Sequence, residues 1–276
     1  MLKTRLDLLL LERGLAESRA KAQAIIMAGQ VRVDGQVVDK AASNVSNNAN
    51  VIIDKGPRFV SRGGEKLEAA LTGFPVEVTG RVCADVGAST GGFTDCLLQH
   101  GAAKVYAIDV GKGLLHWKLR NDPRVVVMEE TNARFVEKLP EAVSLVTMDA
   151  SFISLRVLLP VVINWFSFSN PASHSEESKE EVRRDIIALI KPQFEAGRKE
   201  AARHKGVIRD PAVHQAVLTD ILAVAQSLGF AVRGLRRSPV LGPKGNVEFL
   251  AWLGIGEGEE VDLAALVEKS LEVFST

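Results

Sequence analysis

The sequence has few cysteines, few aromatic residues and no excess of charge of either sign. Cys83 and Cys96 are the two cysteines among 276 residues, and their spacing fits no metal site. Both stand in apolar surroundings, so we expect two reduced thiols in a protein core, as is usual for cytoplasmic proteins. Thirty-four basic residues balance thirty-four acidic ones, so the total charge predicts no partner.

Long hydrophobic runs are also absent. The longest apolar region, residues 155–168, contains Arg156 and Pro160 and falls short of the roughly 20 residues that a spanning helix needs. The segment MLKTRLDLLLLERG has charges on both sides of a short apolar run and no small-residue cleavage site. We therefore expect neither a membrane span nor a signal peptide, and we expect a cytoplasmic location.

Charge is spread unevenly along this neutral chain. Residues 1–60 contain nine Lys and Arg against six Asp and Glu, a local excess of three. A basic end on a neutral protein favours docking to a polyanion. The candidate phosphate contacts are Arg5, Arg19, Lys21 and Arg32. The alternative for each of them is an ordinary solvated side chain that contacts no phosphate.

The first sixty residues have the pattern of a small independent domain. Residues 4–28 show helical periodicity interrupted by Gly14. QVRVDGQVV then alternates valines around Asp34 and Gly35, which predicts a hairpin, and NVIID supplies another short strand. We predict a small α+β domain over residues 1–60, with a linker at about 55–64 in KGPRFVSRGG.

Residues 64–276 alternate between strand-like and helical segments. The strand-like runs are RVCADVG, KVYAIDV, RVVVMEE, SLVTMDA, RDIIALIKP, FAVRGLRRS and NVEFLAWLGI. Repeated βα units with nearly continuous apolar strands predict an α/β fold, in which helices cover both faces of a parallel sheet. The last two runs leave no room for a helix between them, so we expect an antiparallel pair at one edge. The polar stretch 169–185 predicts a solvated, mobile insertion.

A glycine-rich turn follows the first strand of this second domain, in DVGASTGGFTD. Such a turn lets backbone N–H groups and a helix N-terminus approach a ligand. Asp109, at the end of the next strand, is placed to bind ribose hydroxyls. Asn132, after the third strand, is placed to meet an adenine edge, unless it is only a helix cap. The candidate cofactor-binding residues are Asp85, Gly87, Ala88, Ser89, Thr90, Gly91, Gly92, Phe93, Asp109, Asn132 and Asp149.

Two nucleoside cofactors compete for this turn, and a third interpretation is that its glycines only permit tight packing of strand and helix. An NAD-type turn needs a second glycine where Ser89 stands, so a pyrophosphate would meet that side chain. S-adenosylmethionine has no pyrophosphate, so its turn needs no pyrophosphate-binding site. An antiparallel edge pair of strands is also typical of methyltransferase sheets. The sequence therefore favours S-adenosylmethionine.

Four charged residues stand at positions where an unpaired, buried charge would be costly. Asp149 ends the fourth strand, Lys191 ends the fifth, Glu248 interrupts the apolar final strand, and Lys66 lies on the helix before the first strand. Since the carboxyl ends of parallel strands line the ligand crevice, Asp149 and Lys191 should converge beside the cofactor. Each residue alone could be a solvated charge, an interpretation that is weakest for Glu248.

Together these features resemble a known family. The four charged residues and DVGASTGGFTD resemble the Lys-Asp-Lys-Glu tetrad of the FtsJ/RrmJ-type ribose 2′-O-methyltransferases, and RLDLLLLERGLAESRAKAQAIIMAGQVRVDGQVV resembles the S-four RNA-binding domain. That pairing, with SRGGEKL, TMDASFISL and LIKPQFEAGR, is similar to the TlyA family of ribosomal RNA methyltransferases, often labelled hemolysins. The resemblance implies a Rossmann-like, S-adenosylmethionine-dependent methyltransferase that modifies a ribose 2′-hydroxyl, of a cytidine, in ribosomal RNA or ribosomal subunits.

The chemistry assigns a role to each member of the tetrad. A 2′-hydroxyl must lose its proton while it is held in line with the methyl donor. Lys191 would take or polarise that proton, and Asp149 would orient Lys191 and face the donor methyl. Lys66 would add a second positive charge, and Glu248 would hold the lysines in place.

Three alternatives stay open at this point: a membrane-active hemolysin, a nucleotide-dependent oxidoreductase, and a non-catalytic ribosome-assembly factor that binds RNA. The five histidines form no metal-like cluster in the sequence, so we expect no metal.

Overall fold

The computed structural model describes residues 2–54, 56–166, 183–256 and 261–272. The chain divides into two compact units, Met1–Arg58 and Phe59–Thr276, which we call the front unit and the rear unit. Most of the insertion predicted at 169–185 lies outside the described residues. Its last residue, Asp185, is 1% exposed and begins a strand, so the prediction of a solvated segment is wrong there.

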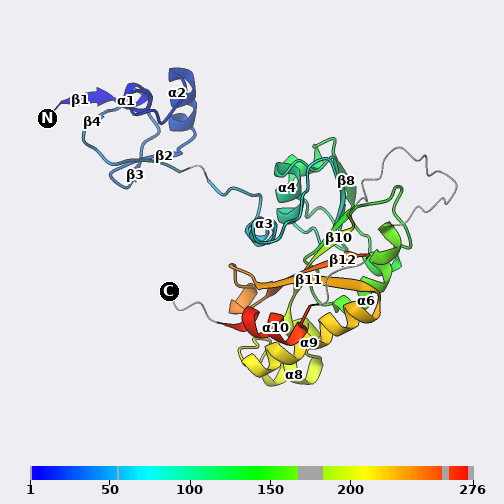
Figure 1. Ribbon diagram of the computed structural model, residues 1–276. Coiled ribbons are helices and arrows are strands. Elements are labelled where there is room, and N and C mark those ends of the chain that lie inside the picture. The colour runs from blue at the N-terminus through cyan, green and yellow to red at the C-terminus, as the bar shows by residue number, and fades with distance from the viewer. Residues whose placement is uncertain (1, 55, 167–182, 257–260, 273–276) are drawn as a thin grey trace. The chain divides into compact units, whose positions relative to one another are not determined.

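The front unit combines two helices with short strands (Figure 1). Its elements are β1 (Lys3–Arg5), α1 (Leu6–Glu12), α2 (Arg19–Met27), β2 (Val31–Val33), β3 (Gln36–Val37), β4 (Asn44–Ser46) and β5 (Val51–Ile53). Strand β2 pairs antiparallel with both β3 and β5. Asp34 and Gly35 have φ of +50° and +85°, as a two-residue hairpin turn requires. The pair of β1 with β4 was not predicted.

The rear unit alternates strands and helices as its sequence predicts (Figure 1). Its first half contains α3 (Gly63–Gly73), β6 (Val82–Val86), α4 (Gly92–Gln99), β7 (Lys104–Ile108), α5 (Trp117–Arg120), β8 (Val125–Met128), η1 (Ala133–Phe135), β9 (Leu145–Met148), α6 (Leu155–Val162) and η2 (Ile163–Phe166). Its second half contains β10 (Asp185–Ile190), α7 (Pro192–Glu195), α8 (Arg198–Arg203), α9 (Pro211–Ser227), β11 (Phe230–Arg237), η3 (Pro243–Gly245), β12 (Phe249–Ile255) and α10 (Leu263–Leu271).

Seven strands of the rear unit form one sheet, in the order β11-β12-β10-β9-β6-β7-β8. The strands from β10 to β8 are parallel to one another, whereas β12 is antiparallel to both of its neighbours. The α/β fold with an antiparallel pair at its edge is therefore confirmed. Strand order reverses beside β6, and such a reversal places the ligand crevice at the carboxyl ends of β6 and β9.

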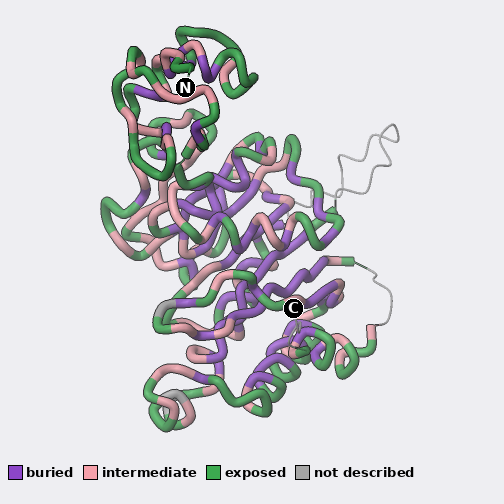
Figure 2. Tube along the Cα trace, turned by 90° about the vertical axis from the view of Figure 1, so that its left-hand side faces the viewer, coloured by how far each residue is buried: buried purple, intermediate pink, exposed green. Residues whose placement is uncertain are grey.

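Buried apolar residues cover both faces of this sheet. The Cα trace in Figure 2 shows buried segments running through the middle of the rear unit. Residues 186–190 of β10 are all exposed by 2% or less. Helices α6 and α9 pack on one face, and α3 and α4 pack on the other. Cys83 and Cys96 form no disulfide and are fully buried on the α3–α4 face, as predicted. Among the described residues, every helix is too short or too polar to cross a membrane.

Candidate active site

Four charged side chains meet at the carboxyl edge of the parallel strands. Lys66 lies on α3, Asp149 follows β9, Lys191 follows β10 and Glu248 precedes β12. Lys191 Nζ lies 2.6 Å from Asp149 Oδ1. Lys66 Nζ lies 2.6 Å from Glu248 Oε2 and 3.8 Å from Asp149 Oδ2. Positive and negative groups thus alternate through the cluster, which we call the tetrad.

The register of the sheet explains how Glu248 reaches this edge. Strand β12 runs antiparallel to β10, and its first residue, Phe249, lies opposite Ile190, the last residue of β10. The next residues outward, Glu248 and Lys191, therefore leave the sheet at the same edge. The sequence places Glu248 inside the final strand, but the strand begins one residue later.

The tetrad is largely shielded from water. The exposed fraction of the side chain is 7% for Lys66 and Lys191, 0% for Glu248 and 21% for Asp149. Buried charges are costly unless they are paired, and here each ammonium group has a carboxylate partner. Gly242 permits the burial of Glu248, since a Cβ at that position would lie 2.3 Å from Oε1 of Glu248. Asp149 is the member most accessible to a ligand.

The predicted glycine-rich turn joins β6 to α4. Gly87 and Gly91 have φ of +82° and +97°, a conformation that favours glycine. A Cβ at Gly87 would lie 2.8 Å from the carbonyl oxygen of Asp149, and one at Gly92 would lie 2.3 Å from Ser61 Oγ. The glycines therefore permit tight packing, as the packing interpretation expects. That packing also holds the turn against the backbone of Asp149.

Polar groups remain accessible beside the turn. Ser89 is exposed, and its N–H donates to Asp109 Oδ2 at 2.8 Å. The N–H of Gly111 donates to Asp109 Oδ1 at 2.7 Å, which fixes that carboxylate at the end of β7. Asn132 caps η1, because its Oδ1 accepts from the N–H of Arg134 at 3.2 Å. The capping role considered for Asn132 is thus present.

Other members of the predicted cofactor set lie beneath the surface. Asp85 is 0% exposed, Phe93 3% and Ala88 7%. Asp85 accepts hydrogen bonds from Thr94 Oγ1 at 2.7 Å and Thr147 Oγ1 at 3.1 Å, so its carboxylate ties the turn to α4 and β9. Gly91 and Gly92 are buried as well. The members that keep some exposure are Gly87, Ser89, Thr90, Asp109, Asn132 and Asp149.

Asp85 should make stability depend on pH. Burial raises the pKa of this carboxyl from 3.8 to about 7, although the two threonine hydroxyls act in the opposite direction. Between these values the folded protein holds a proton that the unfolded chain has lost, so stability falls as pH rises and levels off above about 7. We expect Asp85→Asn to remove this dependence, so that its stability relative to wild type grows by about 1.4 kcal/mol per pH unit in that window. Urea unfolding of both proteins at several pH values measures the difference, and parallel pH profiles would contradict it.

In the front unit, two of the candidate arginines share one buried acidic partner. Asp7 is 0% exposed and accepts from Arg5 Nη2 at 2.9 Å and from Arg19 Nε at 3.1 Å. The Arg5 guanidinium holds the pKa of Asp7 well below its usual range. Both arginine side chains stay partly exposed, as does Arg32, and Lys21 is exposed. Asp7, which the sequence does not single out, therefore orients two of the four candidates.

Comparison with known proteins assigns both units. Residues 59–255 match the model of the FtsJ-like methyltransferases, and residues 4–51 match the S4 domain. The chain belongs to the FtsJ-like methyltransferase family.

Relatives of this FtsJ-like methyltransferase cover nearly all of the chain. YqxC of Bacillus subtilis, provisionally named an rRNA methyltransferase, is 46% identical over 94% of this chain and 90% of its own. The Mycobacterium tuberculosis 16S/23S rRNA (cytidine-2′-O)-methyltransferase TlyA is 44% identical over 91% of this chain and 90% of its own. A solved Streptococcus thermophilus structure, provisionally described as a hemolysin, is 38% identical with a TM-score of 0.69, covering 98% of this chain and 94% of its own. The resemblance to the TlyA family is confirmed.

The loop within TMDASFISL, residues 149–154, lies beside the methyltransferase site. Lys191 Nζ donates to Ser151 Oγ at 2.9 Å. The next residue, Phe152, is 90% exposed and has a left-handed φ of +64°. Its ring centroid lies 4.9 Å from that of Phe194 on α7. A large apolar side chain held exposed in a strained backbone beside a site indicates a function.

Glu195 fastens this loop to α7. Its Oε2 accepts from Ser154 Oγ at 2.5 Å, and its Oε1 accepts from the N–H of Leu155 at 2.8 Å. Burial raises the pKa of Glu195.

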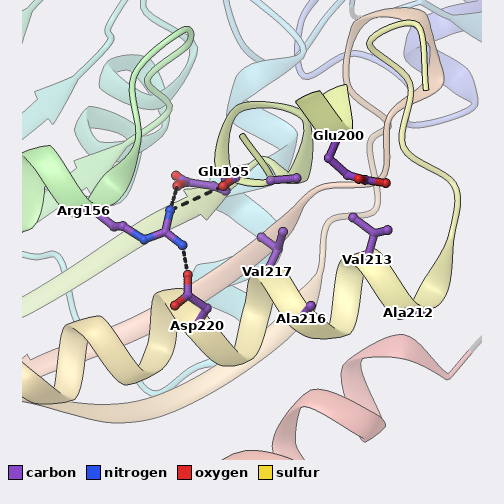
Figure 3. Close-up of a pocket in the computed structure, with 9 residues that line it drawn as sticks. Arg156, Glu195, Glu200, Ala212, Val213, Ala216, Val217 and Asp220 are labelled. Atoms are coloured by element: carbon purple, nitrogen blue, oxygen red, sulfur yellow. Dashed lines mark hydrogen bonds and ion pairs between the residues drawn. The ribbon is translucent and has the colours of Figure 1, made fainter. Parts of the chain in front are cut away.

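Figure 3 shows the Arg156 guanidinium between the carboxylates of Glu195 and Asp220. These side chains line an open pocket of about 540 Å³. The pocket is lined by residues of α6 to α9, whereas the tetrad lies at the edge of the sheet.

A group of potential metal ligands lies elsewhere in the methyltransferase unit, contrary to the expectation that no histidine joins such a cluster. Glu68 on α3 approaches Cys96 and His100 at the end of α4, with their ligand atoms within 4.8 Å of one another. His100 Nε2 lies 2.6 Å from Glu68 Oε2, the contact of a hydrogen bond. Two ligands of one zinc ion, each about 2.0–2.2 Å from it, stand farther apart than this. We therefore assign the group as a hydrogen-bonded contact between helices.

Proposed function

We propose that this protein transfers the methyl group of S-adenosylmethionine to a ribose 2′-hydroxyl of ribosomal RNA, a cytidine as in its named relatives. The observation that carries the proposal is the tetrad, in which Lys191 and Lys66 alternate with Asp149 and Glu248 beside the glycine-rich turn. The matches to the FtsJ-like methyltransferases and the S4 domain support it. A ribosomal substrate puts the reaction in the cytoplasm.

The residues around the turn fit the proposed methyl donor. Asp109 offers a carboxylate for ribose hydroxyls, and Asn132 offers an amide for an adenine edge. Ser89 stands where an NAD-type turn needs glycine. When bound, S-adenosylmethionine supplies a methyl group on a sulfonium, which requires no further activation.

Lys191 acts as the base in this proposal. Its Nζ would take the proton of the 2′-hydroxyl, and the bound donor would supply the methyl group that the oxygen gains in place of that proton. Asp149 orients Lys191 through the 2.6 Å contact and faces the donor as the most exposed tetrad member. Lys66 stabilises negative charge on the acceptor oxygen, and Glu248 holds Lys66 in position.

Phe152 would stack on the base of the acceptor nucleotide. Stacking of a base on an aromatic ring contributes about 1–3 kcal/mol, so Phe152→Ala should lower kcat/KM for RNA by about 5- to 150-fold. The Kd of S-adenosylmethionine should stay the same, and Phe152→Tyr, which keeps the ring, should stay close to wild type. Steady-state kinetics with ribosomal RNA measures this. An unchanged kcat/KM in the alanine variant would remove Phe152 from substrate binding.

The proposed function is tested with purified protein, S-adenosylmethionine carrying a radiolabelled methyl group, and ribosomal subunits or extracted ribosomal RNA. We expect label in the RNA and none in DNA of the same sequence, because DNA lacks the 2′-hydroxyl. S-adenosylmethionine at 100 times its Kd should stabilise the protein by about 2.7 kcal/mol, and NAD should not. Binding of the donor without transfer to any RNA would favour the non-catalytic assembly factor, and stabilisation by NAD alone would favour the oxidoreductase.

A further inference from the structure

Two segments of the rear unit are rich in positive charge and contain no acidic residue. They are residues 203–209 and 236–246, which we call the paired loops. In a chain with zero net charge, such a concentration creates a local positive potential. Their Lys and Arg residues are Arg203, Lys205, Arg209, Arg236, Arg237 and Lys244.

Asn246 fastens the paired loops to each other. Its Oδ1 accepts from the N–H of Ile208 at 3.1 Å, and its Nδ2 donates to the carbonyl of Gly206 at 3.0 Å. Its own carbonyl accepts from the N–H of Gly242 at 2.8 Å. Asn246 is only 3% exposed, so water does not compete freely for these hydrogen bonds. The two loops therefore form one continuous surface.

This surface borders the tetrad. Gly242 packs directly against the carboxylate of Glu248, and the N–H of Ser238 donates to the Glu248 carbonyl at 2.9 Å. Lys205 and Lys244 are both exposed and have left-handed φ of +51° and +64°. Residues other than glycine and asparagine rarely adopt this conformation. Two exposed lysines in strained backbone beside one site indicate a shared role.

Two of the six cations already have partners inside the protein. Arg203 pairs with Glu200 at 3.0 Å, and Arg236 Nη1 donates to the carbonyl of Ala69 at 2.7 Å. Within the ranges that the structure describes, the other members form no ion pair with an acidic side chain. Those members, which can take an external anion, are Lys205, Arg209, Arg237 and Lys244.

We propose that the paired loops bind the phosphates of the RNA strand on either side of the acceptor ribose. This rests on the proposed function and adds a second RNA-binding surface, beside the active site, to the S4 domain. A strand carries one phosphate for every nucleotide, so an acceptor ribose at Lys191 brings flanking phosphates to the edge of the site. Phosphate contacts fix the register of the strand and carry no sequence information.

The test uses the full chain with Lys205→Asn and Lys244→Asn combined, since asparagine is neutral and tolerates a left-handed backbone. Binding of ribosomal RNA is measured from low to high salt. Each lost phosphate contact reduces the magnitude of the slope of log K against log salt by about 0.7–0.9. The slope of the double variant should therefore be smaller in magnitude than that of the wild type by about 1.4–1.8. KM for RNA should rise, and kcat at saturating RNA and the Kd of S-adenosylmethionine should not change. Lys269→Asn, at an exposed position on α10, is the matched control and should keep the wild-type slope.

A second variant guards against a folding artefact. Lys205→Gly combined with Lys244→Gly removes the same two charges and suits the positive φ, so it should show the same loss of slope. A wild-type slope in both double variants, with methyl transfer intact, overturns this proposal and leaves the proposed function standing. If the wild-type protein itself transfers no methyl group to RNA, the proposed function fails instead.

Discussion

Replacing Lys191 with alanine should lower the rate of methyl transfer by about 10²- to 10⁴-fold, the contribution of a positioned general base. Lys191 Nζ lies 2.6 Å from Asp149 Oδ1 and 2.9 Å from Ser151 Oγ, and its side chain is only 7% exposed. Two oxygen acceptors therefore hold one amine at the edge where the turn and the strand ends meet. Most predicted donor-binding groups lie away from Lys191, in the turn and in the loops after β7 and β8, and Asp149 is retained, so the Kd of S-adenosylmethionine should remain nearly unchanged.

Single-turnover kinetics and calorimetric titration of the donor separate these two effects. Lys191→Arg is the matched variant, because arginine keeps the positive charge but cannot lose its proton at any accessible pH. It should be as inactive as Lys191→Ala if the residue is a base, and active if the residue contributes only charge. Undiminished turnover in the alanine variant would exclude Lys191 from the reaction.

Glu248→Ala should destabilise the fold by about 3–5 kcal/mol, the cost of removing one partner from a buried ion pair. Glu248 is fully buried and lies 2.6 Å from Lys66 Nζ, whose next carboxylate, on Asp149, is 3.8 Å away. Its other oxygen accepts from Gln193 Nε2 at 3.2 Å, so that donor also loses its partner. Urea unfolding measures the loss.

A double variant separates stability from catalysis at the same pair. Replacement of a buried ion pair by apolar residues of similar volume is often neutral or stabilising, so Lys66→Met with Glu248→Leu should recover most of the lost stability. It should still fail to transfer methyl groups, because the second positive charge is gone. An unfolding midpoint equal to wild type in Glu248→Ala would show that the pair is not the buried contact described here.

Regular elements of the rear unit follow from local patterns, and the exceptions have local causes. Strand β10 is apolar at nearly every position because it is buried on both faces, and this continuous run predicts a central parallel strand. The insertion of β12 between β10 and β11 depends on pairing between distant segments, so the sequence predicts only that the last two strands pair. Strands β1 and β4 contain three residues each, too few for alternation to be recognised.

Asp149, Lys191 and Glu248 could be proposed from the sequence because each stands at a strand end or within an apolar segment, where a charge is conspicuous, whereas Lys66, on a helix, joins them through the family resemblance. The partners of several other polar side chains could not be proposed in this way. Glu195 joins Ser154 across 41 positions, and Asp7 joins Arg19 across 12, through contacts that no local pattern encodes. The same holds for Glu68 and His100, which come from different helices. Buried polar partners of this kind emerge only when the fold brings the elements together.

The most direct test of the central claim is the chemical form of the label in RNA methylated by the wild-type protein. A methyl group on the 2′-oxygen prevents alkaline cleavage of the adjacent phosphodiester, so the labelled RNA should yield its radioactivity in alkali-stable dinucleotides. Lys191→Ala should yield almost none. Label recovered in mononucleotides, as methylation of a base would give, would contradict the assignment of this site to a ribose hydroxyl.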